Sequence, residues 1–484
     1  MKIRVEQSQN TVLNLFWIAF AFFITNSLTQ YALSSTANLD QSEQLVFSQN
    51  WQLGYSSQPP LYTWLINCLF SITGPSLLIL AGFKVILLSA LIGLLIGIGK
   101  QLAFTTEQQL TSLMGLAFIP QYIWESQRDI THSLLATVLA AATLLQVMRT
   151  RLNPSISNYI IAGFLTAMGI ISKYNFAIFY LALIITAALS PQYRPTILNY
   201  RSLINIGVAV VLVAPHGIWA LNNIDIASSS VHKFNVAEGH YLAGVIDALL
   251  SLLNFLTPLW VISIVLIKDG FQPLNKNQQG ERSFIAKLFV ITMTIVLLLM
   301  LLSGAQNIKV RWYQPLLFYI PLLLALNTSP TQKNLKIYCA IGTFVLIIVA
   351  IALPSRILFA ESLGNKSRPN LPYQNQATNL ANLTREPEAI LSETNLIGGN
   401  MRLYFKNSQI ITPEYDRELV NHGGNKLILC ETKNCQNKKF QDWILNKHKI
   451  DINLLKFNQL ENEYNHISKR KHIFYWAKVE SMSD

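Results

Sequence analysis

Seven long apolar segments constrain this chain more than any other feature of its sequence. A helix that crosses a bilayer needs about 20 consecutive, mostly apolar residues. Four further apolar segments are shorter but gain length from their flanks. We therefore predict a polytopic α-helical membrane protein with about eleven spans. The long segments cover residues 11–33, 76–98, 130–148, 204–220, 241–267, 284–302 and 337–354, and the short ones cover 110–123, 159–171, 176–189 and 312–326.

The charged residues divide the chain into two parts. Only 13% of the 484 residues are charged, about half of the roughly 25% that soluble domains carry, which excludes a disordered chain, a coiled coil and an ordinary cytosolic enzyme. Residues 356–484 nevertheless hold 18 of the 37 Lys and Arg residues and 14 of the 25 Asp and Glu residues. We predict a transmembrane domain over 1–355 and a small soluble domain over 356–484. The net charge of +12 is no argument for a nucleic-acid partner, because much of it marks topology.

The soluble part has the pattern of a small α/β domain. Short apolar or alternating runs predict strands at 389–391, 409–411, 427–430 and 473–479, and 441–447 predicts a helix. Glycine pairs at 398–399 and 423–424 are interpreted as breaks between these elements. Cys430 and Cys435 are close enough in sequence to form a disulfide if this domain lies outside the cytosol.

The distribution of Lys and Arg orients the chain in the membrane. With a cytoplasmic N-terminus, the inner loops carry thirteen basic residues and the outer loops carry five. Eleven spans then place the soluble domain in the periplasm. The segment 61–72 is too short to cross, so we interpret it as an interfacial or re-entrant helix with Tyr62 and Trp64 at the level of the headgroups. The five outer basic residues are Arg128, Lys173, Lys233, Lys309 and Arg311.

The first outer loop contains two carboxylates with helical spacing. Asp40 and Glu43 lie three residues apart and would share one face of a helix. Such a pair serves as a general base with an orienting group, or as ligands of a divalent cation. The alternative is structural: Asp40 caps a helix and Glu43 completes the capping box.

The second outer loop also groups polar side chains. Arg128, Asp129 and His132 are candidates to line a cleft, and the alternative is a pair of helix-end charges with a local Arg–Asp contact.

Basic side chains with aromatic neighbours recur on the outer side. Lys173 and Tyr174 lie between two short apolar segments, and Lys309 and Arg311 form a similar group farther along the chain. An ammonium or guanidinium in this setting suits a phosphate. For Lys173, the alternative is a lysine that extends its amine to the interface.

Two further side chains lie at membrane depth. Lys84 is about ten residues into an apolar segment, and the alternative there is a misplaced span boundary. His216 follows Pro215 and is either functional or a hydrogen-bonded helix-end histidine. Ionisable groups inside a membrane point to function by default.

These features together favour a transferase that uses a lipid-linked phosphate. Carboxylates suit activation of an acceptor hydroxyl, and basic residues suit a lipid-phosphate leaving group. No glycine-rich nucleotide motif stands out. A polysaccharide or lipid transporter is the main alternative, but it predicts duplicated halves, which the sequence lacks. A structural membrane protein is a second alternative, and its outer loops would tolerate loss of charge.

The sequence resembles the GT-C membrane glycosyltransferases. The closest group is family 39, the dolichyl-phosphate-mannose-protein mannosyltransferase-like proteins, with the bacterial lipid A aminoarabinose transferases as relatives. The resemblance covers about residues 10–355. It rests on Leu39-Asp40-Gln41-Ser42-Glu43-Gln44, on Gly54-Tyr55, on Gln58-Pro59-Pro60-Leu61-Tyr62-Thr63-Trp64-Leu65, on Arg128-Asp129, on Ser172-Lys173-Tyr174-Asn175, on Ala214-Pro215-His216 and on Arg311-Trp312-Tyr313-Gln314-Pro315.

The resemblance implies transfer of a sugar from a polyprenyl-phosphate donor to a lipid, glycan or protein hydroxyl at the periplasmic face of the inner membrane. Asp40 matches the family's catalytic acid/base position and Glu43 its second acidic position. Gln58 stands where many members have His, so a hydrogen-bonding role is retained there and a titrating one is not. No cofactor is required, although Asp40 and Glu43 are also candidate ligands of a divalent metal. The expected substrate-binding residues are Gln58, Tyr62, Lys84, Arg128, Asp129, His132, Lys173, Tyr174, His216, Lys309 and Arg311.

The same implication places the charged residues around one reaction. Lys84, Lys173 and Arg311 are the expected contacts of the donor phosphate. We expect Lys173 and Arg311 to reach the same outer-leaflet cavity as Asp40.

Overall fold

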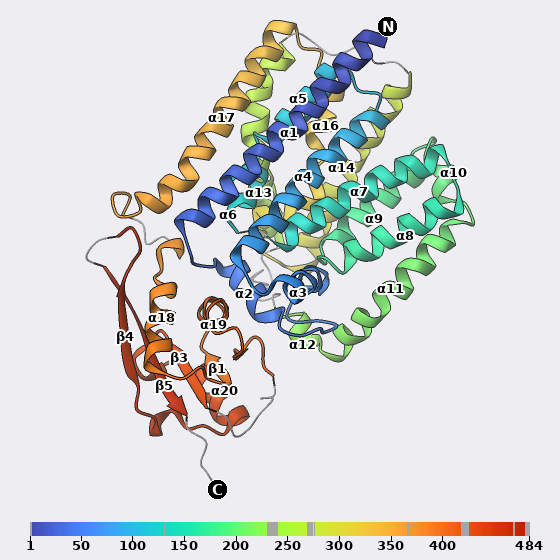
Figure 1. Cartoon of the computed structure of the whole chain (residues 1–484). Coiled ribbons are helices and arrows are strands. Elements are labelled where there is room, and N and C mark those ends of the chain that lie inside the picture. The colour runs from blue at the N-terminus through green and yellow to red at the C-terminus, as the bar shows by residue number, and fades with distance from the viewer. Residues whose placement is uncertain are drawn as a thin grey trace. The chain divides into compact units, whose positions relative to one another are not determined.

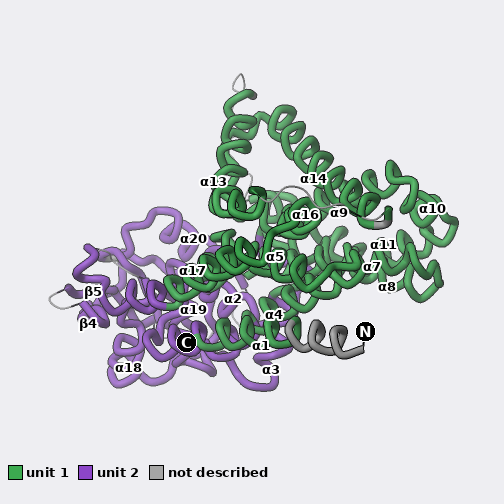
Figure 2. Tube along the Cα trace, turned by 90° about the horizontal axis from the view of Figure 1, so that it is seen from above, with its two compact units in different colours: residues 1–25, 57–62, 84–350 green, residues 26–56, 63–83, 351–484 purple. Residues whose placement is uncertain are grey.

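The computed structural model describes residues 2–129, 131–229, 241–268, 274, 276–364, 368–417, 425–467 and 470–479. The chain packs into two compact units, which Figure 2 colours separately. Unit 1 contains residues 1–25, 57–62 and 84–350. Unit 2 contains residues 26–56, 63–83 and 351–484. The last segment of unit 2 therefore begins close to the domain boundary predicted at residue 355, but the first outer loop joins the C-terminal domain.

Seven helices among the described residues are long and apolar enough to cross a membrane, and they match the seven long apolar segments of the sequence. Residue 130, which begins one predicted span, lies outside the described residues, as does Lys233. The long helices, labelled in Figure 1 where there is room, are α1 (Lys2–Leu33), α4 (Leu77–Gln101), α7 (His132–Leu152), α11 (Ser202–Asn222), α13 (Tyr241–Ile267), α14 (Lys276–Ser303) and α17 (Gln332–Leu358).

The shorter apolar segments differ in continuity. Helices α8 (Ile156–Ile170) and α9 (Phe176–Leu189) are unbroken, and α3 (Leu61–Thr73) confirms a helix over the segment that is too short to cross. The other two predicted short spans are interrupted, and after each break a proline stands at the start of the next helical turn, where its missing N–H costs little. Pro120 separates α5 (Thr106–Leu116) from a π-helix at Gln121–Glu125. The second break divides η3 (Val310–Tyr313), α15 (Gln314–Leu317) and α16 (Ile320–Asn327).

The remaining helices are short or belong to the C-terminal domain. They are α2 (Leu39–Phe47), α6 (Ser126–Arg128), α10 (Arg194–Ile197), α12 (Ile224–Ala227), η4 (Arg368–Asn370), α18 (Tyr373–Leu383), α19 (Asn395–Arg402), η5 (Lys433–Cys435), α20 (Lys438–His448) and η6 (Ile452–Leu454).

The C-terminal domain is built on a five-stranded mixed sheet with strand order β2-β1-β3-β5-β4. Strands β1 (Ala389–Ser392), β2 (Gln409–Ile411) and β3 (Lys426–Cys430) are parallel, whereas β5 (Lys471–Val479) pairs antiparallel with β3 and with β4 (Asn458–Glu463). The four predicted strands and the predicted helix, which is α20, are confirmed. Strand β4 was not predicted because its sequence NQLENE is polar, as suits an edge strand.

One glycine pair was misinterpreted in the sequence. Gly398 and Gly399 lie inside α19 and not in a break between elements. The pair at 423–424 lies outside the described residues.

The first outer loop contributes to the core of the C-terminal domain. One face of the sheet packs into a cluster that includes Ile390, Leu427 and Phe474 together with Val46 and Phe47 of α2. Val46 and Phe47 are almost fully buried there. The loop and the C-terminal domain are therefore one hydrophobic unit, which the two-part composition of the sequence does not reveal.

A disulfide joins Cys430 at the end of β3 to Cys435 in η5, as the sequence spacing suggests. Cys435 is fully buried in the cluster on the other face of the sheet.

Candidate active site

Helix α2 carries both carboxylates of the first outer loop. The way this helix is capped contradicts the structural alternative, in which Asp40 and Glu43 formed the capping box. The N-cap is Asn38, and the Gln41 side chain accepts from the Asn38 backbone N–H at 3.0 Å. Because Asn38 and Gln41 fill the two positions of the capping box, Asp40 and Glu43 are not the capping pair. Asp40 lies in the first turn, where a carboxylate is favoured by the helix dipole.

The expected spacing of the two carboxylates is confirmed. Asp40 and Glu43 lie within α2 and are both half-buried, and neither is free of interactions. Ser42, Leu45 and Val46 are buried on the side of the helix that faces the C-terminal domain. Gln44, also buried, accepts a 2.8 Å hydrogen bond from the Thr63 hydroxyl of α3.

Helix α19 holds the start of α2 through Asn400. The fully buried Asn400 side chain accepts from the Ala37 backbone N–H at 2.8 Å, and it donates to the Ala37 carbonyl and to the Ser42 hydroxyl at 3.2 Å each. The helices pack so closely at Gly399 that an added Cβ would lie 2.3 Å from the Ser42 carbonyl oxygen. A glycine is required there by close approach of backbone.

Arg402 of the same helix holds the end of α2. Its guanidinium donates to the Leu45 carbonyl, to the Ser48 hydroxyl at 3.0 Å and to the Ser48 carbonyl. A cation at this end satisfies carbonyls without helical partners and suits the helix dipole. Burial lowers the pKa of Arg402 to about 10, which leaves it charged at neutral pH. Both ends of the helix that carries Asp40 are thus positioned by the C-terminal domain.

In unit 1, two lysines predicted as phosphate contacts are buried and hydrogen-bonded. Lys84 is 7% exposed within α4 and donates to the Gln127 carbonyl at 3.0 Å. Lys173 is 8% exposed and donates to the Ser133 hydroxyl of α7. Lys84 thus lies well inside α4, and the buried Lys173 amine is bonded to α7 rather than extended away from the protein.

His132 joins this group from the start of α7. Its ring lies 5.1 Å from the Tyr62 ring, between centroids, and both side chains are buried. Lys173 and Arg311 are both close enough to act electrostatically on the His132 imidazole. The first residue of α3, Leu61, donates its backbone N–H to the Ile171 carbonyl at 3.0 Å, which fixes Tyr62 beside the Lys173 turn.

The turn that carries Arg311 is tied to the same group. The buried Asn175 side chain donates to the Trp312 carbonyl at 3.0 Å, and the Gln314 side chain donates to the Ser126 hydroxyl at 2.8 Å. These bonds bring together three loops that are distant in sequence. Lys173 and Arg311 therefore both lie near the His132 imidazole, whereas a cavity shared with Asp40, which lies in unit 2, stays a prediction.

The remaining candidate residues of the second outer loop, Arg128 and Asp129, are partly exposed. Arg128 forms a salt bridge of 3.0 Å with Glu125, and both side chains are about one-third exposed. Glu125 is therefore one ion-pair partner of Arg128. Asp129 is half-buried in the turn that follows α6.

His216 and Tyr174 form a separate aromatic pair. The Tyr174 hydroxyl lies 3.2 Å from Nε2 of His216, and the two rings stack at 5.9 Å. His216 is buried inside α11 and not at a helix end. Tyr174 is 40% exposed, so the pair has one accessible edge.

Lys309 is exposed just before η3, and Gln58 is half-buried before the Pro59-Pro60 turn.

Within the described residues, no group of three or more His, Cys, Asp and Glu residues has an arrangement that could hold a metal ion. A divalent cation at Asp40 and Glu43 stays a prediction.

Sequence reasoning missed the residues that position the candidate site. Ser133 and Asn175 are polar residues that follow the predicted site residues His132 and Tyr174 in the sequence. This adjacency could have identified them as candidates. Gly399, Asn400 and Arg402 gave no such signal, because only the packing of α19 on α2 reveals them.

These features are those expected of a membrane glycosyltransferase, and the comparisons support that class. Residues 57–219 match the family described as dolichyl-phosphate-mannose-protein mannosyltransferase. Over these residues the chain is similar to this family, and it is a glycosyltransferase that uses a lipid-linked sugar.

Two curated relatives cover most of the chain. The lipopolysaccharide core galacturonosyltransferase RgtB of Rhizobium johnstonii is 29% identical over 85% of this chain and 85% of its own length. RgtA of the same organism, also a lipopolysaccharide core galacturonosyltransferase, is 27% identical over 85% and 84%.

A solved structure shares the fold. ArnT from Cupriavidus metallidurans, crystallised with undecaprenyl phosphate, superposes with a TM-score of 0.50 at 12% identity over 96% of this chain and 97% of its own. This likeness confirms a GT-C fold for the chain as a whole.

Proposed function

We propose that this protein transfers galacturonic acid, or a closely related uronic acid, from a polyprenyl phosphate to a lipopolysaccharide core. The observation that carries the proposal is the match to two core galacturonosyltransferases over about 85% of both chains. The undecaprenyl phosphate bound to ArnT supports a polyprenyl-phosphate donor.

The proposed reaction is a displacement at the anomeric carbon. Asp40 takes the proton from an acceptor hydroxyl, or orients that hydroxyl, as its oxygen bonds to the anomeric carbon. The bond between that carbon and the phosphate oxygen breaks, and the sugar configuration inverts. Polyprenyl phosphate leaves with the electron pair. Glu43 orients Asp40 or the acceptor, and no metal is required.

Basic groups in unit 1 stabilise the charge that develops on the phosphate. Lys173 and Arg311 supply this positive charge from turns that the hydrogen bonds of Asn175 and Gln314 keep together. Lys84 supplies it from α4, where it donates to the Gln127 carbonyl. Fixed cations aimed at a leaving group contribute most when they are buried and need no rearrangement. Gln58, Tyr62 and His132 complete the substrate-binding surface, with Arg128, Asp129, Tyr174, His216 and Lys309 at its edges.

The proposed topology has eleven spans, a cytoplasmic N-terminus and a periplasmic C-terminal domain in the bacterial inner membrane. It rests on the thirteen inner and five outer basic residues and on the Cys430–Cys435 disulfide, which suits an oxidising compartment. Reporter fusions after Leu33 and after Asp484 should both report a periplasmic location. A cytoplasmic signal after Asp484 would change the number of spans by one.

The proposed function is tested with purified protein in nanodiscs. It is incubated with a panel of polyprenyl-phosphate sugars and a lipopolysaccharide core acceptor, and the product is detected by its mass. The expected result is addition of one hexuronic acid. Transfer of a neutral hexose or an aminosugar in its place would refute the assignment of the sugar, and transfer to no acceptor would refute the proposed function.

A further inference from the structure

Unit 2 contains a cavity whose lining residues have no role in the reaction as proposed above. Its volume is about 870 Å³, within the range of ligand pockets. Its walls come from the end of α1, the loop between α3 and α4, and three segments of the C-terminal domain. Leu33, which ends α1, and Leu77, which begins α4, both line it. A ligand in the cavity would therefore lie where the chain leaves the membrane.

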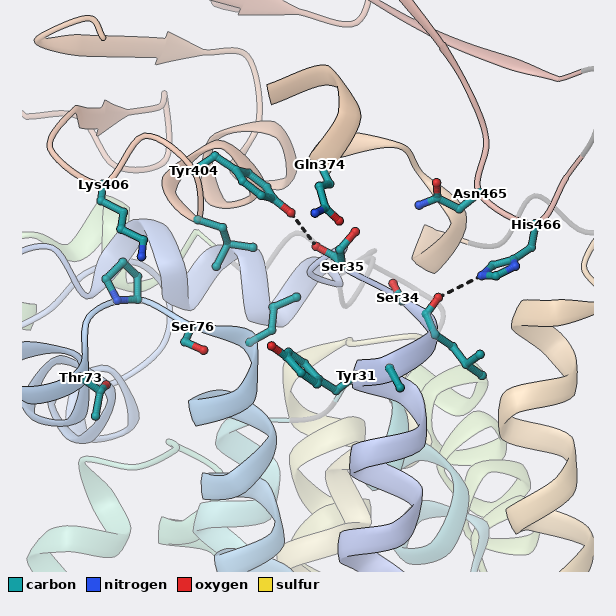
Figure 3. A pocket seen from close by; sticks show the side chains of 15 residues that line it. Tyr31, Ser34, Ser35, Thr73, Ser76, Gln374, Tyr404, Lys406, Asn465 and His466 are labelled. Atoms are coloured by element: carbon teal, nitrogen blue, oxygen red, sulfur yellow. Dashed lines mark hydrogen bonds between the residues drawn. The ribbon is translucent and has the colours of Figure 1, made fainter. Parts of the chain in front are cut away.

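The lining has the chemistry of a site for an anionic sugar. Hydroxyl and amide side chains dominate it, and its fifteen residues include no Asp or Glu. Figure 3 shows Lys406 and His466 at opposite ends of the lining, with Gln374 and Tyr404 between them. Hydroxyls and amides offer both donors and acceptors to sugar hydroxyls, and an ammonium binds phosphate or carboxylate. Tyr31, which is 45% exposed, offers a ring face.

Hydrogen bonds tie the cavity wall together just before the start of α2. The Ser34 hydroxyl donates to the Pro369 carbonyl at 2.7 Å, and His466 donates through Nε2 to the Leu33 carbonyl at 3.1 Å. His466 adopts a left-handed backbone with φ of 56°, a conformation that is uncommon outside glycine and is found at functional sites. These contacts join the end of α1 to two segments of the C-terminal domain across the cavity wall.

The cavity wall lies close in sequence to Asp40, which connects the cavity to the acceptor and not to the donor. Ser35 in its wall precedes Asp40 by five residues, which limits their separation to about 18 Å. Asp40 acts on the acceptor hydroxyl in the proposed reaction, whereas the donor phosphate is assigned to basic residues of unit 1. A membrane-anchored glycan could fill the cavity and extend a hydroxyl toward Asp40.

We propose that this cavity binds the anionic glycan of the membrane-anchored acceptor, with Lys406 as the contact for its phosphate or carboxylate groups. The proposal rests on the proposed function, because only a transferase has an acceptor to place.

The test uses the full chain in nanodiscs and a deacylated lipopolysaccharide oligosaccharide that carries phosphate and carboxylate groups. Lys406→Glu reverses the charge at the cavity, and Ser76→Tyr fills it without a charge change. Lys439→Glu, at an exposed position in the first turn of α20 outside the lining, is the matched control. Direct binding of the oligosaccharide is measured first, without donor, and transfer kinetics second.

The expected loss for Lys406→Glu is about 10- to 100-fold in oligosaccharide affinity and in acceptor KM, the size of one charge-assisted hydrogen bond. Donor KM, and kcat at saturating acceptor, should match those of Lys439→Glu. Ser76→Tyr should weaken binding as well. Unchanged acceptor KM in both cavity variants would overturn the proposal and leave the proposed function intact, as would an effect on donor KM alone. Equal binding of a neutral oligosaccharide would overturn the anionic assignment. An inactive wild-type protein would refute the function, while the binding measurement would still decide whether the cavity takes the oligosaccharide.

Discussion

The sharpest prediction concerns Gly399, where α19 meets the helix that carries Asp40. In Gly399→Ala the new Cβ would lie 2.3 Å from the Ser42 carbonyl oxygen and 2.6 Å from the Ser42 Cα. Both are backbone atoms, so relief requires the helices to separate by about 1 Å to reach ordinary contact. A displacement of about 1 Å at a catalytic group costs on the order of 100-fold in rate. We therefore expect kcat to fall about 100-fold.

Gly398→Ala is the matched control on the same helix. Its Cβ would meet the Ser392 hydroxyl at 2.5 Å and an Ile410 methyl carbon at 2.8 Å, which are side-chain atoms inside the C-terminal domain. Both substitutions gain about 1 kcal/mol of helix propensity and cost roughly 1–3 kcal/mol by overpacking. Melting temperatures should therefore be similar, while only Gly399→Ala loses turnover. Equal turnover of the two variants and wild type would refute the claim that α19 positions α2.

Three further predictions concern other parts of the chain. Cys430→Ser should destabilise the C-terminal domain by about 2 kcal/mol, since the disulfide closes a short loop, and peptide mapping of untreated membranes should find Cys430 bound to Cys435; free thiols at both would contradict the periplasmic location. Burial lowers the pKa of His472 to about 4, so the unfolded chain binds more protons between pH 4 and 6.5 and the domain should lose stability as the pH falls through that window, an effect that thermal melts should find reduced in His472→Gln. Lys173→Gln should lower kcat by about 10- to 1000-fold, as loss of one stabilising group does, with little change in acceptor KM; normal turnover would remove Lys173 from the proposed site.

The membrane part was predictable because its signal is local. Apolar length alone located the seven long helices, and short apolar or alternating runs located four of the five strands. Interruptions were less visible, since the prolines that break 110–123 and 312–326 lie within apolar runs. Each of these breaks still leaves helical turns on both sides.

The arrangement of the candidate site depended on contacts between distant segments. The role of Asn400 beside Ala37 and Ser42 follows from packing over more than 350 residues of separation. Nothing in the sequence near α19 marks Asn400 as a contact of α2. The neighbouring pair Gly398-Gly399 is typical of a break between elements, although it lies inside the helix. Asp40 and Glu43 were found because helical spacing is a local property. The true capping pair, Asn38 and Gln41, could be identified only once the first residue of α2 was known.

Turnover by Asp40→Asn tests the central claim most directly. Asn is nearly isosteric with Asp but cannot accept the proton, and the helix cap at Asn38 and Gln41 is untouched. Transfer of the sugar from polyprenyl phosphate should fall by about 10²- to 10⁴-fold, the share that general base catalysis contributes. Expression and melting temperature should match those of the wild-type protein. Turnover close to wild type in this variant would contradict the account, because Asp40 would then have no part in the chemistry.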